Sequence, residues 1–244
     1  MSTPSTTGNT AHQPFSASAP APASLTERRK AETRMEIARA AAALFVRQGL
    51  RATRAEDIAQ AAGIAPRTFY RYFASKEEAV APLYAAGAQL WTQAVREAPP
   101  ALTVPEALRH AVHQTLTPGA AVSASSWEWV RTLIRLADAS PALRKVWAEV
   151  CQSSEKTLAE ILAERSPVSR GRTDSADPES GDNVARPSVI PPRVHFAAAV
   201  AGAAVRVAVE SWSTTTSPPA GPTGPAALAL QNLEALGEFE WGEE

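Results

Sequence analysis

The chain has 244 residues, 45% of them hydrophobic, and a formal net charge of −1, which allows one large or two small domains with a buried core. No apolar run approaches the ~18 residues of a membrane span, and the first 25 residues contain no basic segment of the kind that begins a signal peptide. A single cysteine, Cys151, excludes an intrachain disulfide and fits a reducing compartment, so we expect a cytoplasmic protein without membrane contact.

The N-terminal segment, residues 1–24, contains Ser, Thr, Pro and Ala but no Lys, Arg, Asp or Glu, and we expect it to be disordered. A helix is predicted from about Leu25 to Gln48. Its inner face is predicted to carry Ile37, Ala41, Leu44 and Phe45. Arg28, Arg29 and Lys30 near its start could contact nucleic-acid phosphates or, equally, form a solvated basic cluster.

Residues 53–78, TRAEDIAQAAGIAPRTFYRYFASKEE, predict a helix-turn-helix followed by a further helix. Thr53 and Glu56 have the spacing of a capping box, and Gly63 is suited to end the helix that they begin. Pro66 suits the first turn of the next helix. Ser75 and Glu78 form a second capping-box pattern ahead of the helix that follows.

The short helix that begins at Pro66 divides its side chains between two faces. Phe69 and Phe73 are four residues apart and should pack inward. Guanidinium groups can bind guanine edges and hydroxyls can bind phosphate, so the outward set is a candidate for reading DNA. A solvated basic face over core aromatics is the alternative, but the capped neighbours and the glycine turn favour DNA binding. The outward candidates are Arg67, Thr68, Tyr70, Arg71 and Tyr72.

Charge is concentrated on this part of the chain. Residues 26–76 contain eleven Lys and Arg and five Asp and Glu, a charge of +6, which leaves −7 for the remainder. Affinity for DNA depends on such a concentration of positive charge. The distribution therefore supports the interpretation of the helix-turn-helix.

Residues 28–84 resemble the N-terminal domain of the TetR family of one-component transcriptional regulators. The resemblance is carried by ALFVRQG, RAEDIAQAAGI and TFYRYFASKEE, in that order and spacing. It implies an all-α homodimer with a three-helix DNA-binding head at 25–76 and a larger ligand-binding and dimerisation body at 77–244. It also implies that Lys76 contacts phosphate, and we add Arg54 to the DNA-binding candidates.

The resemblance further implies how the protein would act. A dimer would bind a pseudo-palindromic operator in double-stranded DNA, and a small-molecule effector in the body would release it. A repressor and an activator would look the same in sequence.

Two positions depart from the family pattern. Ala65 leaves the recognition helix without the polar cap that is common at this position. Pro82 falls six residues into a helix expected from Lys76 towards Glu97, where a proline would remove a backbone hydrogen bond and bend the helix. We therefore expect a kink near Glu78–Pro82.

In the body we expect helices at 104–116, 125–139, 141–165, 192–215 and 223–238. Residues 166–192 are rich in Ser, Pro, Asp and Gly and should form a long mobile loop. The helix at 192–215 is dense in Ala and Val, which suits a buried helix or a subunit interface. The resemblance places the last two helices in a four-helix dimer bundle.

The ligand is the least defined part of the prediction. Apolar faces of the middle helices supply an aromatic and aliphatic lining that suits a hydrophobic effector, although any one of these residues could be ordinary core. Arg131 and Arg135 share a helical face and could bind an anionic group or lie in solvent. The candidates for the ligand site are Trp127, Val130, Arg131, Leu133, Ile134, Trp147, Phe196 and Val200.

The sequence favours neither an enzyme nor a metalloprotein. His110 and His113 are three apart, but no further ligand with suitable spacing accompanies them. There is no GxSxG, phosphate-loop or GxGxxG motif, and we expect no cofactor. The competing function is an architectural DNA-binding protein, or a regulator controlled by a protein partner instead of a small molecule.

Overall fold

The computed structural model describes residues 24–121, 123, 126–165, 190–237, 239 and 241. The expected tail at 1–24, apart from Ser24, and the expected loop at 166–192, apart from its last three residues, lie outside this set, as do residues 125 and 238 at the ends of two expected helices. All regular elements in the described ranges are helices, so the predicted all-α class is confirmed.

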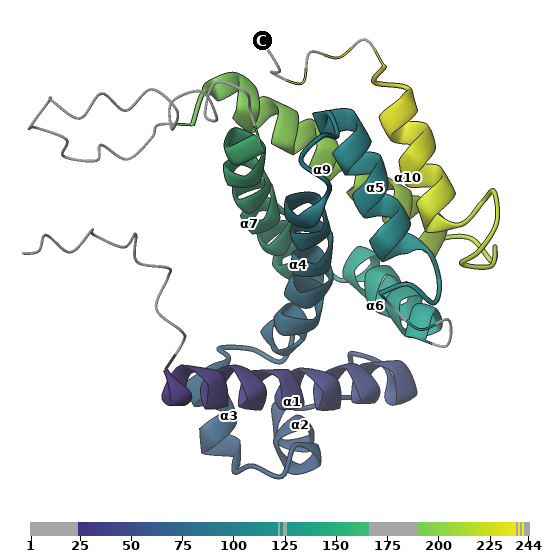
Figure 1. Cartoon of the computed structure of the whole chain (residues 1–244). Helices are drawn as coiled ribbons and strands as arrows, with labels where there is room; N and C mark the ends of the chain where they lie inside the picture. The colour runs from purple at the N-terminus through teal and green to yellow at the C-terminus, as the bar shows by residue number, and fades with distance from the viewer. Residues whose placement is uncertain are drawn as a thin grey trace, which may run out of the picture.

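Three helices form a head at one end of the molecule, and the others form a bundle that joins it through α4 (Figure 1). Within the bundle, α7 packs against α4, α6 and α9, while α10 packs against α9 and α5. The head contains α1 (Leu25–Gln48), α2 (Ala55–Ala61) and α3 (Pro66–Tyr72). The bundle contains α4 (Ala81–Glu97), α5 (Val104–Leu116), α6 (Trp127–Ala139), α7 (Pro141–Arg165), α9 (Pro192–Ser213) and α10 (Pro225–Glu234).

Helix α1 has the predicted bounds and the predicted inner face. The Ser24 hydroxyl accepts a hydrogen bond from the backbone N–H of Glu27 at 3.2 Å, which caps the first turn. Ile37, Ala41, Leu44 and Phe45 are all buried. The helix ends at Gly49, whose φ of 84° is a left-handed conformation that glycine adopts without strain.

The cap of α2 lies one residue later than predicted. The backbone N–H of Arg54 donates to the Asp57 carboxylate at 2.8 Å, so Arg54 and not Thr53 precedes the first turn. Thr53 is fully buried, and its hydroxyl donates instead to the carbonyl of Gly49 at 2.9 Å. The prediction of a Thr53–Glu56 box was wrong because the end of α1 engages the Thr53 hydroxyl.

The predicted start of the next helix at Lys76, with Pro82 in its interior, is also wrong. A short 3-10 helix, η1 (Glu78–Val80), precedes α4, and Pro82 stands in the first turn of α4. The Glu78 carbonyl accepts from the N–H of Ala81, so the N–H that Pro82 lacks is not needed there. The Glu78 N–H donates to Ser75 Oγ at 3.3 Å, and the Glu78 carboxylate accepts from the N–H of Ala74 at 3.0 Å.

Two apolar clusters fill the interior. The first joins the head to the lower bundle, because Ile37 and Phe45 of α1 share it with Leu133 and Ile134 of α6. The second lies in the upper bundle, where buried alanines of α9 such as Ala201 pack with α5, α7 and α10. Contrary to the expectation from the sequence, α9 has the length and the apolar composition of a membrane-spanning helix. A buried core helix of a soluble protein can have the same length and composition.

Candidate nucleic-acid interface and internal cavity

Helix α3 separates a buried aromatic face from an exposed basic face. Phe69 and Phe73 are 0% and 3% exposed, and their ring centroids lie 5.8 Å apart. Arg67 and Arg71 are exposed. Ala65 precedes the helix without a side-chain cap, as the sequence predicted. The two guanidinium groups therefore project from a short helix that its phenylalanines hold in place.

The other outward candidates differ in exposure. Tyr70 is 54% exposed, and its hydroxyl donates to the Glu56 carboxylate of α2 at 3.4 Å. Tyr72 and Thr68 are half-buried. Arg54 is exposed at the start of α2, which packs against α3. Tyr70, Arg54 and the two arginines of α3 are thus the most accessible members of the predicted set.

Lys76 has a structural partner that the sequence did not indicate. Its Nζ donates to the carbonyls of Leu50 and Thr53, at 2.8 Å each, and so ties the segment after α3 to the turn between α1 and α2. An ammonium group has three donors, so one remains for another acceptor. In this geometry Lys76 stabilises the head whether or not it contacts phosphate.

Arg34 of α1 holds the C-terminal end of the recognition helix α3, and sequence reasoning did not identify it. Its guanidinium donates to the carbonyl of Tyr72 at 3.1 Å and lies 4.7 Å from the ring centroid of Phe73. The partner is 38 residues away in the chain, so the local pattern of α1 contains no signal for this contact.

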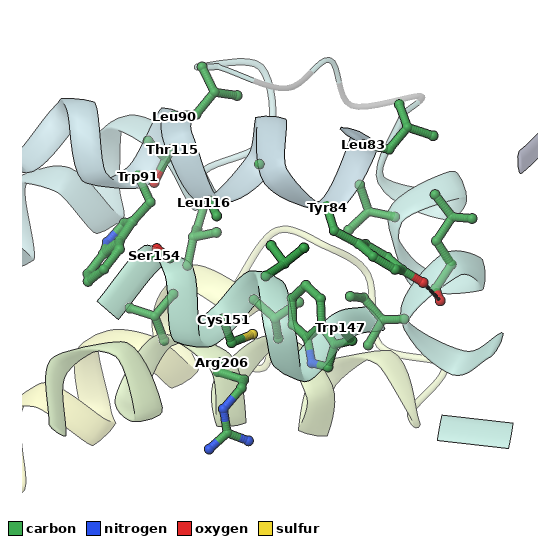
Figure 2. Close-up of a pocket in the computed structure, with 18 of the residues that line it drawn as sticks. Leu83, Tyr84, Leu90, Trp91, Thr115, Leu116, Trp147, Cys151, Ser154 and Arg206 are labelled. Atoms are coloured by element: carbon green, nitrogen blue, oxygen red, sulfur yellow. Dashed lines mark hydrogen bonds between the residues drawn. The ribbon is translucent and has the colours of Figure 1, made fainter. Parts of the chain in front are cut away.

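A cavity of about 320 Å³ lies inside the bundle, between α4, α5, α6, α7 and α9 (Figure 2). Its wall is mostly aromatic and aliphatic. The aromatic members are Tyr84, Trp91, Trp127, Trp129 and Trp147.

Two of these aromatic side chains use their polar atoms within the protein. The Tyr84 hydroxyl donates to the carbonyl of Leu133 at 2.8 Å, and burial raises the pKa of this phenol well above its ordinary value. Trp147 packs edge-on against Tyr84 with ring centroids 5.1 Å apart, and its indole N–H donates to Glu210 at 2.7 Å. The phenol therefore stays neutral and acts as a link between α4 and α6.

The ionisable groups of the wall gather on α7 and α9. Arg206 forms an ion pair with Glu210 at 3.0 Å, and Glu155 of α7 also lines the cavity. Cys151 also lines the cavity, where burial raises the pKa of its thiol to about 12. A thiol with this pKa is protonated at neutral pH and is a poor nucleophile.

The structure brings together only part of the predicted ligand site. Trp127, Val130, Leu133, Ile134 and Trp147 line the cavity. Arg131, Phe196 and Val200 do not line it.

Contacts elsewhere in the structure explain why these three residues do not line the cavity. The Arg131 guanidinium donates to the carbonyls of Thr215 and Ser217 and lies 4.2 Å from the ring centroid of Trp212. Phe196 is 62% exposed and packs on Phe239, while Val200 packs against the upper apolar cluster. The exposed Arg135 reaches only the carbonyl of Thr214, at 3.5 Å.

Sequence reasoning had not connected α4 and α5 with a ligand, and on α7 and α9 it missed most of the residues that line the cavity. Gly87 of α4 and Gly202 of α9 are glycines in helix interiors, and both line the cavity, so they were the available signal. The further lining residues include Leu83, Leu90, Leu116, Val150, Ser154, Val205 and Val209. Among the described residues, no group of three or more His, Cys, Asp or Glu could hold a metal ion.

Comparisons with known proteins agree with this architecture. Residues 37–81 match the family described as bacterial regulatory proteins, tetR family. The HTH-type transcriptional regulator TcmR of Streptomyces glaucescens is 31% identical over 160 residues, which cover 64% of this chain and 70% of the relative. The HTH-type transcriptional repressor KstR2 of Mycobacterium tuberculosis is 53% identical over 47 residues, 19% of this chain and 24% of that protein.

A solved chain from Rhodococcus sp., described as a TetR-family transcriptional regulator, shares the fold. It has a TM-score of 0.50 at 16% identity, over 84% of this chain and 98% of the other. The match to TcmR extends well beyond the head, into the helical bundle. The chain belongs to the TetR family of DNA-binding transcriptional regulators.

Proposed function

We propose that the protein is a homodimeric repressor that binds a pseudo-palindromic operator and is released from it by a small, largely hydrophobic ligand. The observation that carries this proposal is the pairing of an exposed basic recognition helix with an apolar cavity in the same chain. The helix supplies a DNA contact and the cavity supplies a place for an effector. The two are connected through α4 and α6.

The DNA-binding part rests on the exposed face of α3. Arg67 and Arg71 are accessible, and a guanidinium can donate two hydrogen bonds to the edge of one guanine. The backbone carbonyl of Tyr72 and the ring of Phe73 are held by Arg34, so the helix is positioned before DNA arrives. In a dimer, two such helices would enter successive major grooves ~34–36 Å apart.

The dimer part rests on an apolar stripe that α9 presents outward. Val207 and Phe196 are 43% and 62% exposed, and Ala203, between them, is half-buried. Their spacing along the helix places them on one side, while the buried alanines of α9 face the core. A second copy of α9, with α10 beside it, would remove this stripe from water.

The ligand part rests on how the cavity wall connects to the head. Leu133 and Ile134 of α6 line the cavity and also belong to the apolar cluster that contains Phe45 of α1. Tyr84 links α4 to α6 in the same region. A ligand that displaces α4 or α6 would therefore shift the head, and operator binding must weaken ligand affinity by the same factor.

A regulator without a small-molecule ligand remains the second candidate. Protein interiors are close-packed, and a cavity of about 320 Å³ within a helical bundle is at the size of small-molecule sites. This volume favours the ligand-responsive function over an architectural one.

Protection of the DNA upstream of the protein's own gene against nuclease cleavage tests the operator. Fluorescence anisotropy then measures the affinity of wild type and variants for the protected sequence and for random DNA. Arg67→Ala and Arg71→Ala should each lose about 1–3 kcal/mol of discrimination between the two DNAs. Arg109→Ala, an exposed arginine on α5, should lose none. Equal losses on both DNAs would reduce the two residues of α3 to phosphate contacts.

Size-exclusion chromatography tests the dimer. Val207→Arg or Ala203→Arg should shift the protein towards monomer and abolish operator binding, because a charge would be buried at the interface. Gln152→Arg adds the same charge at an exposed position of α7 and should leave the dimer intact. A wild-type protein that is monomeric at micromolar concentration would refute the dimer.

A further inference from the structure

We propose that the cavity selects an uncharged apolar molecule and that Gly87 sets the largest group that it admits. The inference rests on the proposed function, in which this cavity holds the effector. Beyond that function, we infer that the ligand is uncharged and that one residue limits the size of the ligand.

The charges of the wall exclude an anionic ligand. Arg206 is the arginine of the wall, and its guanidinium is already paired with Glu210 at 3.0 Å. Glu155 places a carboxylate in the wall itself. A bound carboxylate or phosphate would lose its hydration, find the guanidinium of the wall already paired, and face the Glu155 carboxylate, which is unfavourable.

The two arginines that the sequence offered for an anion are engaged elsewhere. Arg131 is 6% exposed and donates to carbonyls of the segment between α9 and α10. Arg135 lies outside the wall. Arg131 cannot turn into the cavity without breaking its contacts, and among the described residues Arg206 is the only lysine or arginine that lines the cavity.

Gly87 is a glycine that packing does not require. Glycine destabilises a helix interior relative to alanine. A Cβ built on Gly87 would have no heavy atom within 4 Å, so packing would admit an alanine at this position. At Gly202, by contrast, a Cβ would lie 3.0 Å from Cγ of Glu155. Close packing of helices explains Gly202, whereas the missing side chain of Gly87 leaves space in the cavity.

Gly87 also lies at the mouth of the cavity. Leu90 of α4 and Trp129 of α6 both line the cavity and are each 45% exposed. Leu83 and Trp91 are the first and last residues of α4 that line the cavity, and Gly87 lies between them in sequence (Figure 2). An uncharged molecule can pass this apolar rim without losing the hydration of an ionic group.

The first test measures binding of the neutral fluorescent probe N-phenyl-1-naphthylamine to the full-length protein. Gly87→Leu should weaken binding by about tenfold or more, because its side chain occupies the space of the probe. Ala86→Leu is the matched control, since Ala86 borders a groove on another side of α4 and does not line the cavity. The control should bind the probe within about twofold of wild type.

The second test displaces the probe with a matched pair of ligands at pH 7. 1-Naphthalenemethanol should displace it at a concentration about tenfold lower than 1-naphthoate, and Glu155→Gln should narrow that gap. If naphthoate competes as well as the alcohol, or if Gly87→Leu binds the probe as wild type does, this inference is overturned while a ligand-released repressor still stands. If wild type does not bind the probe, the proposed ligand response and this inference fail together.

Discussion

Replacing Arg131 by methionine should destabilise the fold by about 3–5 kcal/mol, because this side chain joins α6 to the segment after α9. The guanidinium donates to the carbonyls of Thr215 and Ser217. Loss of each charged hydrogen bond would cost ~1–2 kcal/mol, because water would then hydrogen-bond the two carbonyls only in part. Its position 4.2 Å from the ring centroid of Trp212 adds ~1 kcal/mol. Methionine keeps most of the apolar volume, so the loss reports the polar contacts.

Urea unfolding at a fixed protomer concentration would measure this difference, because the stability of a dimer depends on concentration. Arg135→Met is the control: this exposed arginine lies one turn away and makes a single contact with Thr214 at 3.5 Å, so the change should stay within about 0.5 kcal/mol. A loss below ~1 kcal/mol for Arg131→Met, or equal losses for the two variants, would refute the reasoning.

Three further substitutions and one thiol-reactivity measurement test other features. Lys76→Met should lower the free energy of unfolding by about 2 kcal/mol in urea, since two carbonyls lose their donor; unchanged stability with a salt slope for DNA binding flatter by about one unit would instead indicate a phosphate contact. Tyr84→Phe should cost about 1 kcal/mol by the same measurement, through the lost bond to Leu133. Pro82→Ala should stay within ~1 kcal/mol of wild type, and a gain of ~3 kcal/mol would show that the proline strains α4. At pH 8 the Cys151 thiol should react with a disulfide reagent at least about tenfold more slowly than in the unfolded chain, because a pKa of about 12 keeps it protonated; equal rates would show an accessible thiolate.

Features that depend on near neighbours in the chain could be predicted from the sequence. The bounds of α1 and α5 and the inward turn of Phe69 and Phe73 follow from helical periodicity and from Gly, Pro and Thr at the helix ends. Errors arose where a distant or competing partner decided the outcome. Thr53 bonds back to the end of α1 instead of capping α2, and Pro82 begins a helix because η1 comes before it.

The cavity could be predicted only in part for the same reason. Apolar periodicity identifies the inward face of α6, and residues such as Trp127 and Ile134 do line the cavity. It does not reveal which inward faces meet around a void, so the contributions of α4, α5 and α9, and all of α7 except Trp147, were missed. The side chain of Arg131 lies on the buried side of α6, but its partners are 84 and 86 residues away, and no local pattern distinguishes such an arginine from one that binds a ligand.

The position of Pro82 has a mechanical consequence for how the head and the body communicate. A continuous helix from Lys76 to Glu97 could wind or unwind a turn at its lower end and so change its length. Because the proline ring excludes a preceding α-helical turn that would need its N–H, α4 keeps a fixed starting point above η1. A shift of the body would therefore reach the head through η1 without a change in the length of α4.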